Sequence, residues 1–375
     1  MTINNKKLIV AVAGGGTGGH IYPAVAVVQA LKTDNDIEKV YYIGCPRNME
    51  KEIALKEKFE FIPVSISGMP RKLGFGLIKW FFELNKAVCD AVIQLKKIKP
   101  DVILGTGGYV SGPVLIAAII LRIPFVIHDP DAHPGIVNRL MAPWAKAVSV
   151  AFEEARNYIN SKNIIVNGNP IRSNINNVEK EMALKELNLS TSKKTLLVMG
   201  GSQGAKTINS AMLKAAPVLI NDYNLQIIHQ TGKKNYDEYI EQLYYNWPEY
   251  NENPYYIARP YFDNMSIPLV AADLAISRAG SLSISELNLS GLPSILIPYP
   301  FAASDHQRHN AKALTKAGAS AYLEDAECNQ NNLIKMILEI FNDEEKLESM
   351  KIINKKLSKP YATDNLVKII KNATI

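Results

Sequence analysis

The chain has 375 residues, of which 47% are hydrophobic and 21% charged, and its formal net charge is +6. The length favours two domains, the composition is that of a globular protein, and no apolar run reaches the ~20 residues that a membrane-spanning helix needs. The three cysteines match no metal or disulfide spacing, so we expect reduced thiols in a cytoplasmic protein. The positive charge suits anionic partners, but no zinc-ligand pattern, RNA-binding aromatic motif or basic run favours nucleic acid.

Short β-rich runs alternate with helical patterns through the first half of the chain. Amphipathic spacing predicts helices at Ile21–Leu31 and Leu77–Lys97. The opening MTINNKK leads directly into the first strand, so we expect no signal peptide. The predicted strands are Leu8–Ala13, Val40–Ile43, Glu60–Val64, Val102–Leu104, Phe125–His128 and Ala147–Val150.

The second half repeats this alternation, which predicts parallel sheets that bind ligands at the carboxyl ends of their strands. Residues 168–177 are rich in Gly, Pro and Asn and form the expected linker. A charged helical tail, 343–375, should break at Lys359-Pro360. We expect domains at 1–167 and 168–357 with a last helix at 358–375. The predicted strands are Thr195–Met199, Gln226–His229, Tyr255–Ile257, Leu274–Ser277, Ile295–Pro298 and Ala319–Tyr322.

A glycine-rich turn, AGGGTGGH at 13–20, follows the first strand and opens a helix. Its glycines fit G-x-G-x-x-G, but the second strand ends in Cys45-Pro46 instead of the acidic residue that a dinucleotide site expects, which disfavours a dehydrogenase. With Thr17 and His20, the turn can present amides, a hydroxyl and an imidazole to a sugar or phosphate. The alternative is a merely tight strand–helix turn.

A second such turn, GGSQGA at 200–205, heads the second half. It suits a pyrophosphate, with the Ser202 hydroxyl as an added donor. The turn lacks the Lys-Ser/Thr ending of a P-loop, so we do not expect nucleotide hydrolysis with bound magnesium.

Two further segments follow strands in the second half. In 277–287, we expect Ser281 to cap a helix and Glu286 to accept hydrogen bonds from ribose hydroxyls; the alternative is an ordinary capped helix with a solvated Glu. The segment 297–311 suits sugar hydroxyls, although it also fits a plain polar loop. Its polar residues are Asp305, His306, Gln307, His309 and Asn310, and its two histidines lack a third zinc ligand nearby.

The first half carries two more polar loops, GTGGYVSGP at 105–113 and IHDPDAHPG at 127–135. Both follow strands, so we expect them at the same sheet edge as His20. Converging imidazole, carboxylate and amide groups there predict a base-plus-anion site.

The segment 71–86 combines aromatic and aliphatic residues with lysine and arginine. Such a mixture seats a protein on an anionic bilayer, whereas a core helix with snorkelling lysines is the alternative. We expect membrane contact, because the apolar set is wider than one helix face normally buries. The predicted contacts are Lys72, Leu73, Phe75, Leu77, Ile78, Lys79, Trp80, Phe81 and Phe82.

Seven motifs occur in order: GGTGGH, GGY-x-SGP, GNP-x-R, GGSQGA, FDNM, S-x-SE and HQ-x-x-NA. Together they resemble the bacterial UDP-N-acetylglucosamine:lipid I N-acetylglucosaminyltransferases of glycosyltransferase family 28, over nearly the whole chain. The resemblance implies a GT-B fold, in which two Rossmann-like parallel-sheet domains face a cleft and the C-terminal helix returns to the first domain. It also implies no obligatory metal, an anionic membrane surface as partner, and a peripheral place on the cytoplasmic face of the plasma membrane.

By motif match, the resemblance places UDP-N-acetylglucosamine (UDP-GlcNAc) in the second half. Phe262 would meet uracil through its backbone, Glu286 the ribose and Gln307 the sugar hydroxyls. The loop of Gly107, Gly108 and Tyr109 would help hold lipid I's diphosphate, and Asp129 is a further implied acceptor-binding residue. The implied donor-binding set is Thr17, Gly18, Gly19, Asp131, Arg172, Ser202, Phe262, Ser281, Leu282, Ser283, Ile284, Ser285, Glu286 and Gln307.

One segment departs from the family pattern. The family usually has H-E-x-N where this chain has His128-Asp129-Pro130-Asp131. Asp129 keeps a carboxylate on a shorter stem, whereas Asp131 replaces an amide donor with a negative charge.

The implied reaction is an inverting transfer of N-acetylglucosamine to the muramyl 4-hydroxyl of lipid I, giving lipid II. His20 is the expected base, because a neutral imidazole accepts a proton near pH 7. Amides at helix N-termini would stabilise the leaving diphosphate, with Ser202 and Arg172 adding to them. The alternatives are a transferase acting on another lipid such as diacylglycerol, a UDP-GlcNAc 2-epimerase, and a non-catalytic nucleotide-sugar binding protein.

Overall fold

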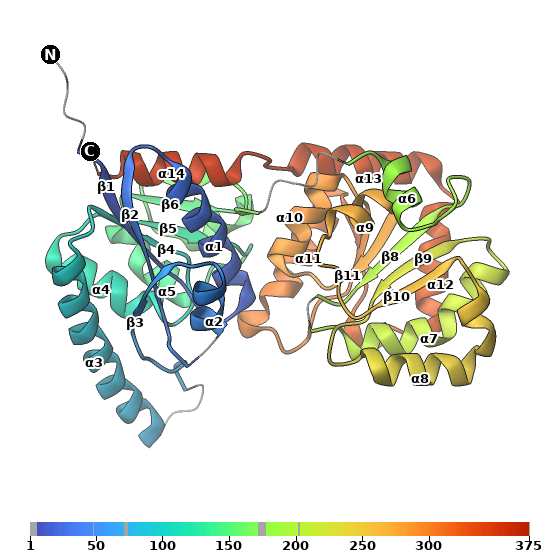
Figure 1. Ribbon diagram of the computed structural model, residues 1–375, viewed down its shortest axis with the longest axis horizontal. Coiled ribbons are helices and arrows are strands. Elements are labelled where there is room, and N and C mark those ends of the chain that lie inside the picture. The colour runs from blue at the N-terminus through green and yellow to red at the C-terminus, as the bar shows by residue number, and fades with distance from the viewer. Residues whose placement is uncertain (1–5, 48, 71–73, 172–177, 202, 375) are drawn as a thin grey trace, which may run out of the picture. The chain divides into compact units, whose positions relative to one another are not determined.

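The computed structural model describes residues 6–47, 49–70, 74–171, 178–201 and 203–374. The chain forms two compact units (Figure 1). Unit 1 comprises residues 1–171 and 359–375, and unit 2 comprises residues 172–358. The division therefore falls in the Gly-, Pro- and Asn-rich stretch at 168–177.

Over its described residues, unit 1 contains a seven-stranded parallel sheet in the order β3-β2-β1-β4-β5-β6-β7. The strand order reverses between β1 and β4, the switch point where doubly wound sheets bind ligands. The strands are β1 Leu8–Ala13, β2 Ile37–Gly44, β3 Glu60–Pro63, β4 Val102–Gly105, β5 Phe125–Asp129, β6 Ala147–Val150 and β7 Ile164–Val166.

Helices cover both faces of this sheet (Figure 1). Side chains alternate along a strand, so Val10 of β1 packs toward α1 and α14 while Ala11 packs toward α3 and α4. Burial on both faces explains why these strands are almost continuously apolar. The helices are α1 Gly18–Thr33, α2 Met49–Lys56, α3 Phe75–Ile98, α4 Ser111–Leu121, α5 Ile136–Met141 and α14 Ala362–Asn372, with short 3₁₀ turns η1 Ala142–Trp144 and η2 Glu153–Tyr158.

The last helix, α14, belongs to unit 1 although it follows unit 2 in the chain. The chain breaks its helix at Lys359-Pro360, as the sequence predicts, and α14 then packs its apolar face into the unit 1 core. The Asn167 side-chain amide donates to the Ala362 carbonyl at 2.8 Å. Lys371 pairs with Asp34 at 3.0 Å, so contacts at both ends hold the helix in place.

Over its described residues, unit 2 contains a six-stranded parallel sheet in the order β10-β9-β8-β11-β12-β13. Its order reverses between β8 and β11, the equivalent of the unit 1 switch point. The strands are β8 Thr195–Met199, β9 Gln226–Gln230, β10 Tyr256–Arg259, β11 Leu274–Ser277, β12 Ser294–Leu296 and β13 Ser320–Tyr322.

The helices of unit 2 again follow strands and cover the sheet. One core cluster joins α7, α8 and α12 to the sheet through Met212, Leu243 and Ile337. The helices are α6 Lys180–Glu186, α7 Lys206–Asn221, α8 Tyr236–Asn246, α9 Ser266–Ala271, α10 Ser281–Ser290, α11 His306–Ala317, α12 Gln330–Phe341 and α13 Glu344–Leu357, with 3₁₀ turns η4 Pro248–Glu252, η5 Ala303–Asp305 and η6 Asp325–Glu327.

The structure confirms the α/β prediction and every predicted strand to within a few residues. It adds β7, which the sequence did not indicate. This strand has three half-buried residues at the sheet edge, too few for an alternating pattern to show.

Candidate active site

In unit 1, the glycine-rich turn joins β1 to α1 at the switch point. The first turn of α1 has no acidic residue and no side-chain cap, so no carboxylate of the helix itself occupies its first amides. Thr17 is exposed and His20 half-buried. Gly16 has φ +89°, a conformation that glycine adopts without strain.

The 105–111 loop interlocks with this turn. A Cβ on Gly108 would lie 1.9 Å from the Gly15 carbonyl oxygen, and one on Gly107 would lie 2.9 Å from Nδ1 of His20. The Thr106 hydroxyl donates to the His20 carbonyl at 2.8 Å. The glycine-rich turn and the 105–111 loop, predicted to lie at the same sheet edge, are therefore packed against each other, and the His20 imidazole lies directly over Gly107.

Two buried side chains that the sequence analysis missed also hold the turn. Oε1 of Glu50, a fully buried residue of α2, accepts the Gly16 N–H at 2.7 Å. The Tyr42 hydroxyl donates to the Gly14 carbonyl at 2.9 Å, and burial raises its pKa above the usual range. A Cβ on Gly15 would lie 2.0 Å from Oε1 of Glu50, so the carboxylate fills the space beneath the turn.

Asp129 lies at the end of β5 and is fully buried. Oδ1 accepts the Asp131 N–H at 3.0 Å, while Oδ2 accepts the Asn138 side-chain amide at 2.8 Å and the Gly135 N–H at 3.0 Å. Burial, with the nearby charge of Asp131, raises the pKa of Asp129 to about 7. These hydrogen bonds to the carboxylate fix the conformation of the 129–135 loop. Asp131 is also buried, at 8% exposure.

His128 ties this loop to the GNP motif. Its Nε2 lies 3.1 Å from Oδ1 of Asn169, and its Nδ1 lies 3.1 Å from the Ser149 hydroxyl. Burial lowers the pKa of His128 to about 4, so the ring is neutral at pH 7. No local pattern in the sequence indicates this role, because β5 is buried along its whole length.

In unit 2, the second glycine-rich turn joins β8 to α7 at the other switch point. A Cβ on Gly204 would lie 2.0 Å from the Thr231 carbonyl oxygen, and one on Gly232 would lie 2.3 Å from the Gly204 nitrogen. Gly201 and Gly204 have φ +81° and +77°. The first turn of α7 has no acidic residue and no side-chain cap. In this turn, backbone packs directly on backbone, and the Asn235 side-chain amide donates to the Gln203 carbonyl at 3.0 Å.

Gln230, a residue that the sequence analysis missed, connects this turn to the FDNM segment. Oε1 accepts the Phe262 N–H at 2.9 Å, and Nε2 donates to the Gly201 carbonyl at 3.4 Å. Phe262 is 6% exposed, with the Arg259 guanidinium over its ring. The second glycine-rich turn is predicted to meet the diphosphate and the FDNM segment the uracil. The Gln230 side chain hydrogen-bonds to both.

The predicted helix at 281–290 is present as α10, but Ser281 does not cap it. Gly280 occupies the N-cap position and no side chain caps the helix, because Ser281 is already its first helical residue. Glu286 is half-buried in the second turn, and burial raises its pKa to about 7. Ile284 is 1% exposed, so it can meet a ligand only through its backbone. Leu282, Ser283 and Ser285 are half-buried.

Gln307 lies in the first turn of α11, where its Oε1 accepts the Tyr299 N–H at 2.9 Å. Asn310 is buried and donates to the Ala279 carbonyl at 3.2 Å, which joins α11 to the start of α10. Among the residues that the structure describes, no group of three or more His, Cys, Asp or Glu side chains is arranged to hold a metal ion.

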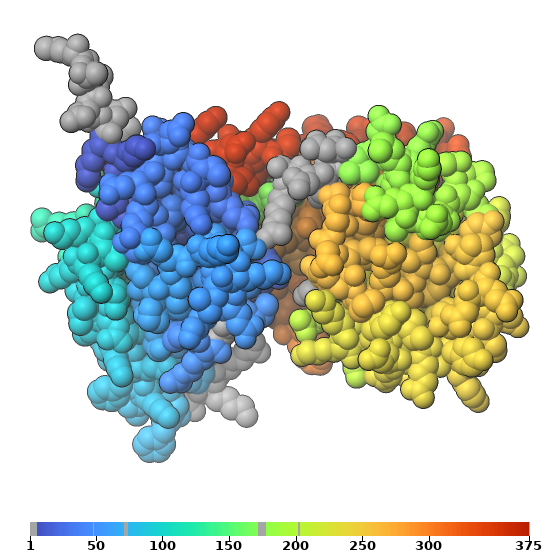
Figure 2. Space-filling model, viewed as in Figure 1, coloured from blue at the N-terminus to red at the C-terminus, as the bar shows by residue number. Residues whose placement is uncertain are grey.

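The first turns of α3 expose an apolar surface. Phe75 is 91% exposed, Phe82 70%, Phe81 61% and Ile78 57%, beside exposed Lys79. Trp80 and Leu77 are half-buried, and the Trp80 indole donates to the Ser67 carbonyl at 3.0 Å. These turns project from unit 1 (Figure 2). No described helix has the length and hydropathy to cross a bilayer.

Comparison with known proteins decides the family. Residues 10–150 match the N-terminal domain model of glycosyltransferase family 28, and residues 195–366 match its C-terminal domain model. The chain belongs to glycosyltransferase family 28. The two matched ranges contain both glycine-rich turns, one in each domain.

Full-length relatives carry a more specific name. The UDP-N-acetylglucosamine--N-acetylmuramyl-(pentapeptide) pyrophosphoryl-undecaprenol N-acetylglucosamine transferase of Halothermothrix orenii is 41% identical, covering 96% of this chain and 97% of the relative. The protein of the same name from Desulforamulus reducens is 40% identical over the same shares.

Solved structures agree on the fold. Acinetobacter baumannii MurG superimposes with a TM-score of 0.78 at 27% identity, covering 98% of this chain and 99% of that one. A UDP-GlcNAc 2-epimerase from Neisseria meningitidis reaches 0.64 at 14% identity over 97% and 99%, which shows a shared fold alone. The predicted GT-B fold of this family 28 member is confirmed.

Four residues predicted for the family 28 sites, Lys72, Leu73, Arg172 and Ser202, lie outside the described residues. Within unit 1, the turn that contains Thr17, Gly18 and Gly19 contacts the 107–109 loop. The contacts are made by Gly15, Gly16 and His20. Within unit 2, shared hydrogen bonds connect the second turn to Phe262, and α10 to α11.

Proposed function

We propose that this protein transfers N-acetylglucosamine from UDP-GlcNAc to the 4-hydroxyl of the muramyl sugar of lipid I, with inversion, and so forms lipid II for peptidoglycan. The observation that carries the proposal is 41% identity, over 96% of the chain, to a transferase of that name. The two switch-point turns supply the amides and the imidazole that this reaction needs.

Unit 2 is the proposed donor unit. Ribose hydroxyls would donate to Glu286, and uracil would meet the backbone of Phe262, whose N–H is already held by Gln230. The diphosphate would lie at the N-termini of α7 and α10, where Ser281, Leu282 and Ser283 begin a helix without a carboxylate in its first turn. Ser202 and Arg172 remain proposed contacts by motif match alone.

Unit 1 is the proposed acceptor unit. The muramyl oxygen attacks the anomeric carbon, the bond to UDP breaks on the opposite face, and His20 takes the hydroxyl proton. The diphosphate of lipid I would meet the 107–109 loop. Because both Asp129 oxygens accept hydrogen bonds from its own loop, we propose that Asp129 acts on the acceptor through that loop. Thr17, Gly18, Gly19 and Asp131 would border the reacting sugar.

We also propose that the α3 surface docks on the cytoplasmic face of an anionic membrane, where a lipid-linked acceptor is anchored. The support is its four exposed apolar side chains beside Lys79. The triple variant Phe75→Ser, Phe82→Ser, Lys79→Glu should lose co-sedimentation with anionic vesicles. Tyr245→Ser, an 87% exposed aromatic of unit 2, is the matched control. Unchanged co-sedimentation of the triple variant would contradict this surface.

Transfer of labelled N-acetylglucosamine to a lipid I analogue, run with and without chelator, tests the activity. We expect transfer in both conditions. Turnover of UDP-GlcNAc without acceptor would instead favour a 2-epimerase, and transfer to diacylglycerol but not to lipid I would favour another lipid acceptor.

A further inference from the structure

The turn that precedes α11 is held in an unfavourable backbone conformation. Ser304 and Asp305 have φ of +52° and +55°, within the left-handed region that side chains with a Cβ rarely adopt. Both belong to the short 3₁₀ turn η5, which leads directly into α11, the helix whose second residue is Gln307. Two successive residues in this region persist only where neighbouring groups hold them.

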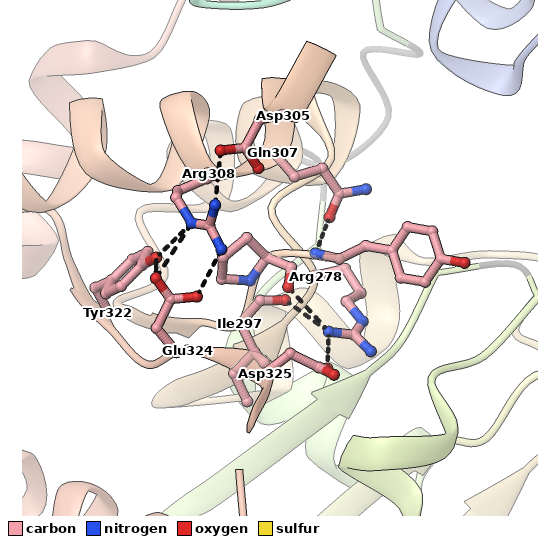
Figure 3. A network of polar contacts seen from close by, with 10 residues as sticks. Arg278, Ile297, Asp305, Gln307, Arg308, Tyr322, Glu324 and Asp325 are labelled. Carbon is pink, nitrogen blue, oxygen red and sulfur yellow. Dashed lines mark hydrogen bonds and ion pairs between the residues drawn. The ribbon is translucent and has the colours of Figure 1, made fainter. Parts of the chain in front are cut away.

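Arg308 is the side chain that holds this turn from outside (Figure 3). Within the turn, the Asp305 N–H also donates to the Ala302 carbonyl at 3.1 Å. Its Nη1 donates to Oδ2 of Asp305 at 2.8 Å, and its Nη2 donates to Oε2 of Glu324 at 3.0 Å. Its Nε lies 3.1 Å from Oε1 of Glu324 and 3.3 Å from the Tyr322 hydroxyl, which also donates to Glu324. The planar guanidinium therefore ties the strained turn to the end of β13 through three of its nitrogens.

The turn determines where Gln307 points. Because Oε1 of Gln307 accepts the Tyr299 N–H, the amide nitrogen is the end that remains for a ligand (Figure 3). A side chain fixed in this way offers N–H donors to sugar oxygens. If the turn relaxed, α11 would begin differently and this amide would lose its orientation.

We propose that Arg308 is a positioning residue for recognition of the donor sugar. By holding Ser304 and Asp305 in the left-handed region, it fixes the start of α11 and presents the Gln307 amide to the hexosamine. Arg308 acts through Gln307 and does not touch the substrate. This inference rests on the proposed function, in which Gln307 reads the sugar hydroxyls.

Its expected contribution to global stability is small. The Arg308, Asp305 and Glu324 side chains are each about one third exposed, and ion pairs of that exposure contribute little to folding. If Arg308 only stabilised the fold, its loss would weaken the binding of all ligands equally. If Arg308 holds Gln307, its loss weakens the binding of only those ligands that carry the sugar.

The test compares UDP-GlcNAc with UDP, which lacks the sugar. Arg308→Met keeps the aliphatic stem but removes the fork. We expect its Kd for UDP-GlcNAc to rise about tenfold, the loss of roughly one well-placed hydrogen bond, while its Kd for UDP changes by less than about twofold. Arg156→Met is the matched control, because Arg156 makes an exposed i,i+3 ion pair with Glu153 in unit 1.

A second substitution tests the conformational argument. Glycine adopts positive φ freely, so Asp305→Gly in the Arg308→Met background should recover part of the UDP-GlcNAc affinity. Equal weakening of UDP and UDP-GlcNAc by Arg308→Met would overturn the proposal. Should that variant not fold, Arg308→Lys, which keeps the charge without the fork, is measured in the same way.

Gln307→Ala separates this proposal from its premise. If Gln307→Ala leaves UDP-GlcNAc affinity unchanged, the proposed role of Gln307 fails. If Gln307→Ala weakens the binding of UDP-GlcNAc but not of UDP, and Arg308→Met does not, the proposed role of Gln307 stands and that of Arg308 is wrong.

Discussion

The two glycine-rich turns have similar sequences and occupy equivalent switch points, yet they are held in different ways. In unit 1, the buried Glu50 carboxylate accepts the Gly16 N–H and therefore occupies an amide that could have bound an anion. In unit 2, the turn is packed on the 231–232 backbone, and the side-chain amides of Gln230 and Asn235 donate to its carbonyls. Both α1 and α7 begin without an acidic residue or side-chain cap, so the difference lies in the groups that contact the turns. We therefore propose that the surroundings specialise the same loop type: the first turn places an imidazole, and the second leaves amides for a diphosphate.

The largest expected effect tests the catalytic side of this comparison. His20→Ala should lower turnover by about 10²- to 10⁴-fold, the usual contribution of a general base, while the Kd for UDP-GlcNAc stays near that of the unchanged protein. Single-turnover transfer to a lipid I analogue and calorimetry with the donor measure the two quantities. A turnover that barely moves would show that another group takes the proton.

A smaller effect is expected where Glu50 supports the first turn. Glu50→Ala leaves the Gly16 N–H without its protein acceptor and empties the buried space beneath the turn, which costs about 1–3 kcal/mol and should loosen the turn that carries His20. We expect turnover to fall by about tenfold with little change in the Kd for UDP, which lacks the sugar that this turn is proposed to border. Glu52→Ala, an exposed residue of the same helix, is the control. A weakened Kd for UDP in Glu50→Ala would place the first turn at the nucleotide and contradict this division.

The smallest expected effect is a pH dependence of donor binding in unit 2. Burial raises the pKa of Glu286 to about 7, so the carboxyl is largely protonated below that pH. Ribose hydroxyls donate better to the ionised form, and UDP-GlcNAc affinity should therefore rise by up to about tenfold between pH 6 and 8. Glu286→Gln should bind more weakly and without this dependence, whereas exposed Glu327→Gln should keep it. A flat profile in the unchanged protein would refute the assignment.

The sequence predicts the elements and the ligand-facing loops well, because apolar strands and glycine-rich turns are local patterns. The supports of those loops are not local. Glu50 and Gln230 come from other strands and helices, and nothing in their own neighbourhoods marks them as buried. The prediction that Ser281 caps α10 was wrong. Gly280 is the N-cap residue, and the position at which the helix begins depends on where the preceding strand ends in three dimensions.

The burial of Asp129 shows the same limit. A carboxylate after a strand suits a substrate contact, and the sequence cannot indicate that the 131–138 segment folds back to donate three hydrogen bonds to it. In both units, the residue types at a site were predictable, whereas which groups face the ligand depends on packing between distant segments.

The most direct test of the different roles of the two turns is UDP affinity in two matched glycine variants. Gly108→Ala would place a Cβ 1.9 Å from the Gly15 carbonyl oxygen, and Gly204→Ala would place one 2.0 Å from the Thr231 carbonyl oxygen, both at positive φ. We predict that Gly204→Ala weakens UDP binding at least about tenfold, while Gly108→Ala binds UDP normally but loses turnover. Equal loss of UDP affinity in both folded variants would contradict the division of roles.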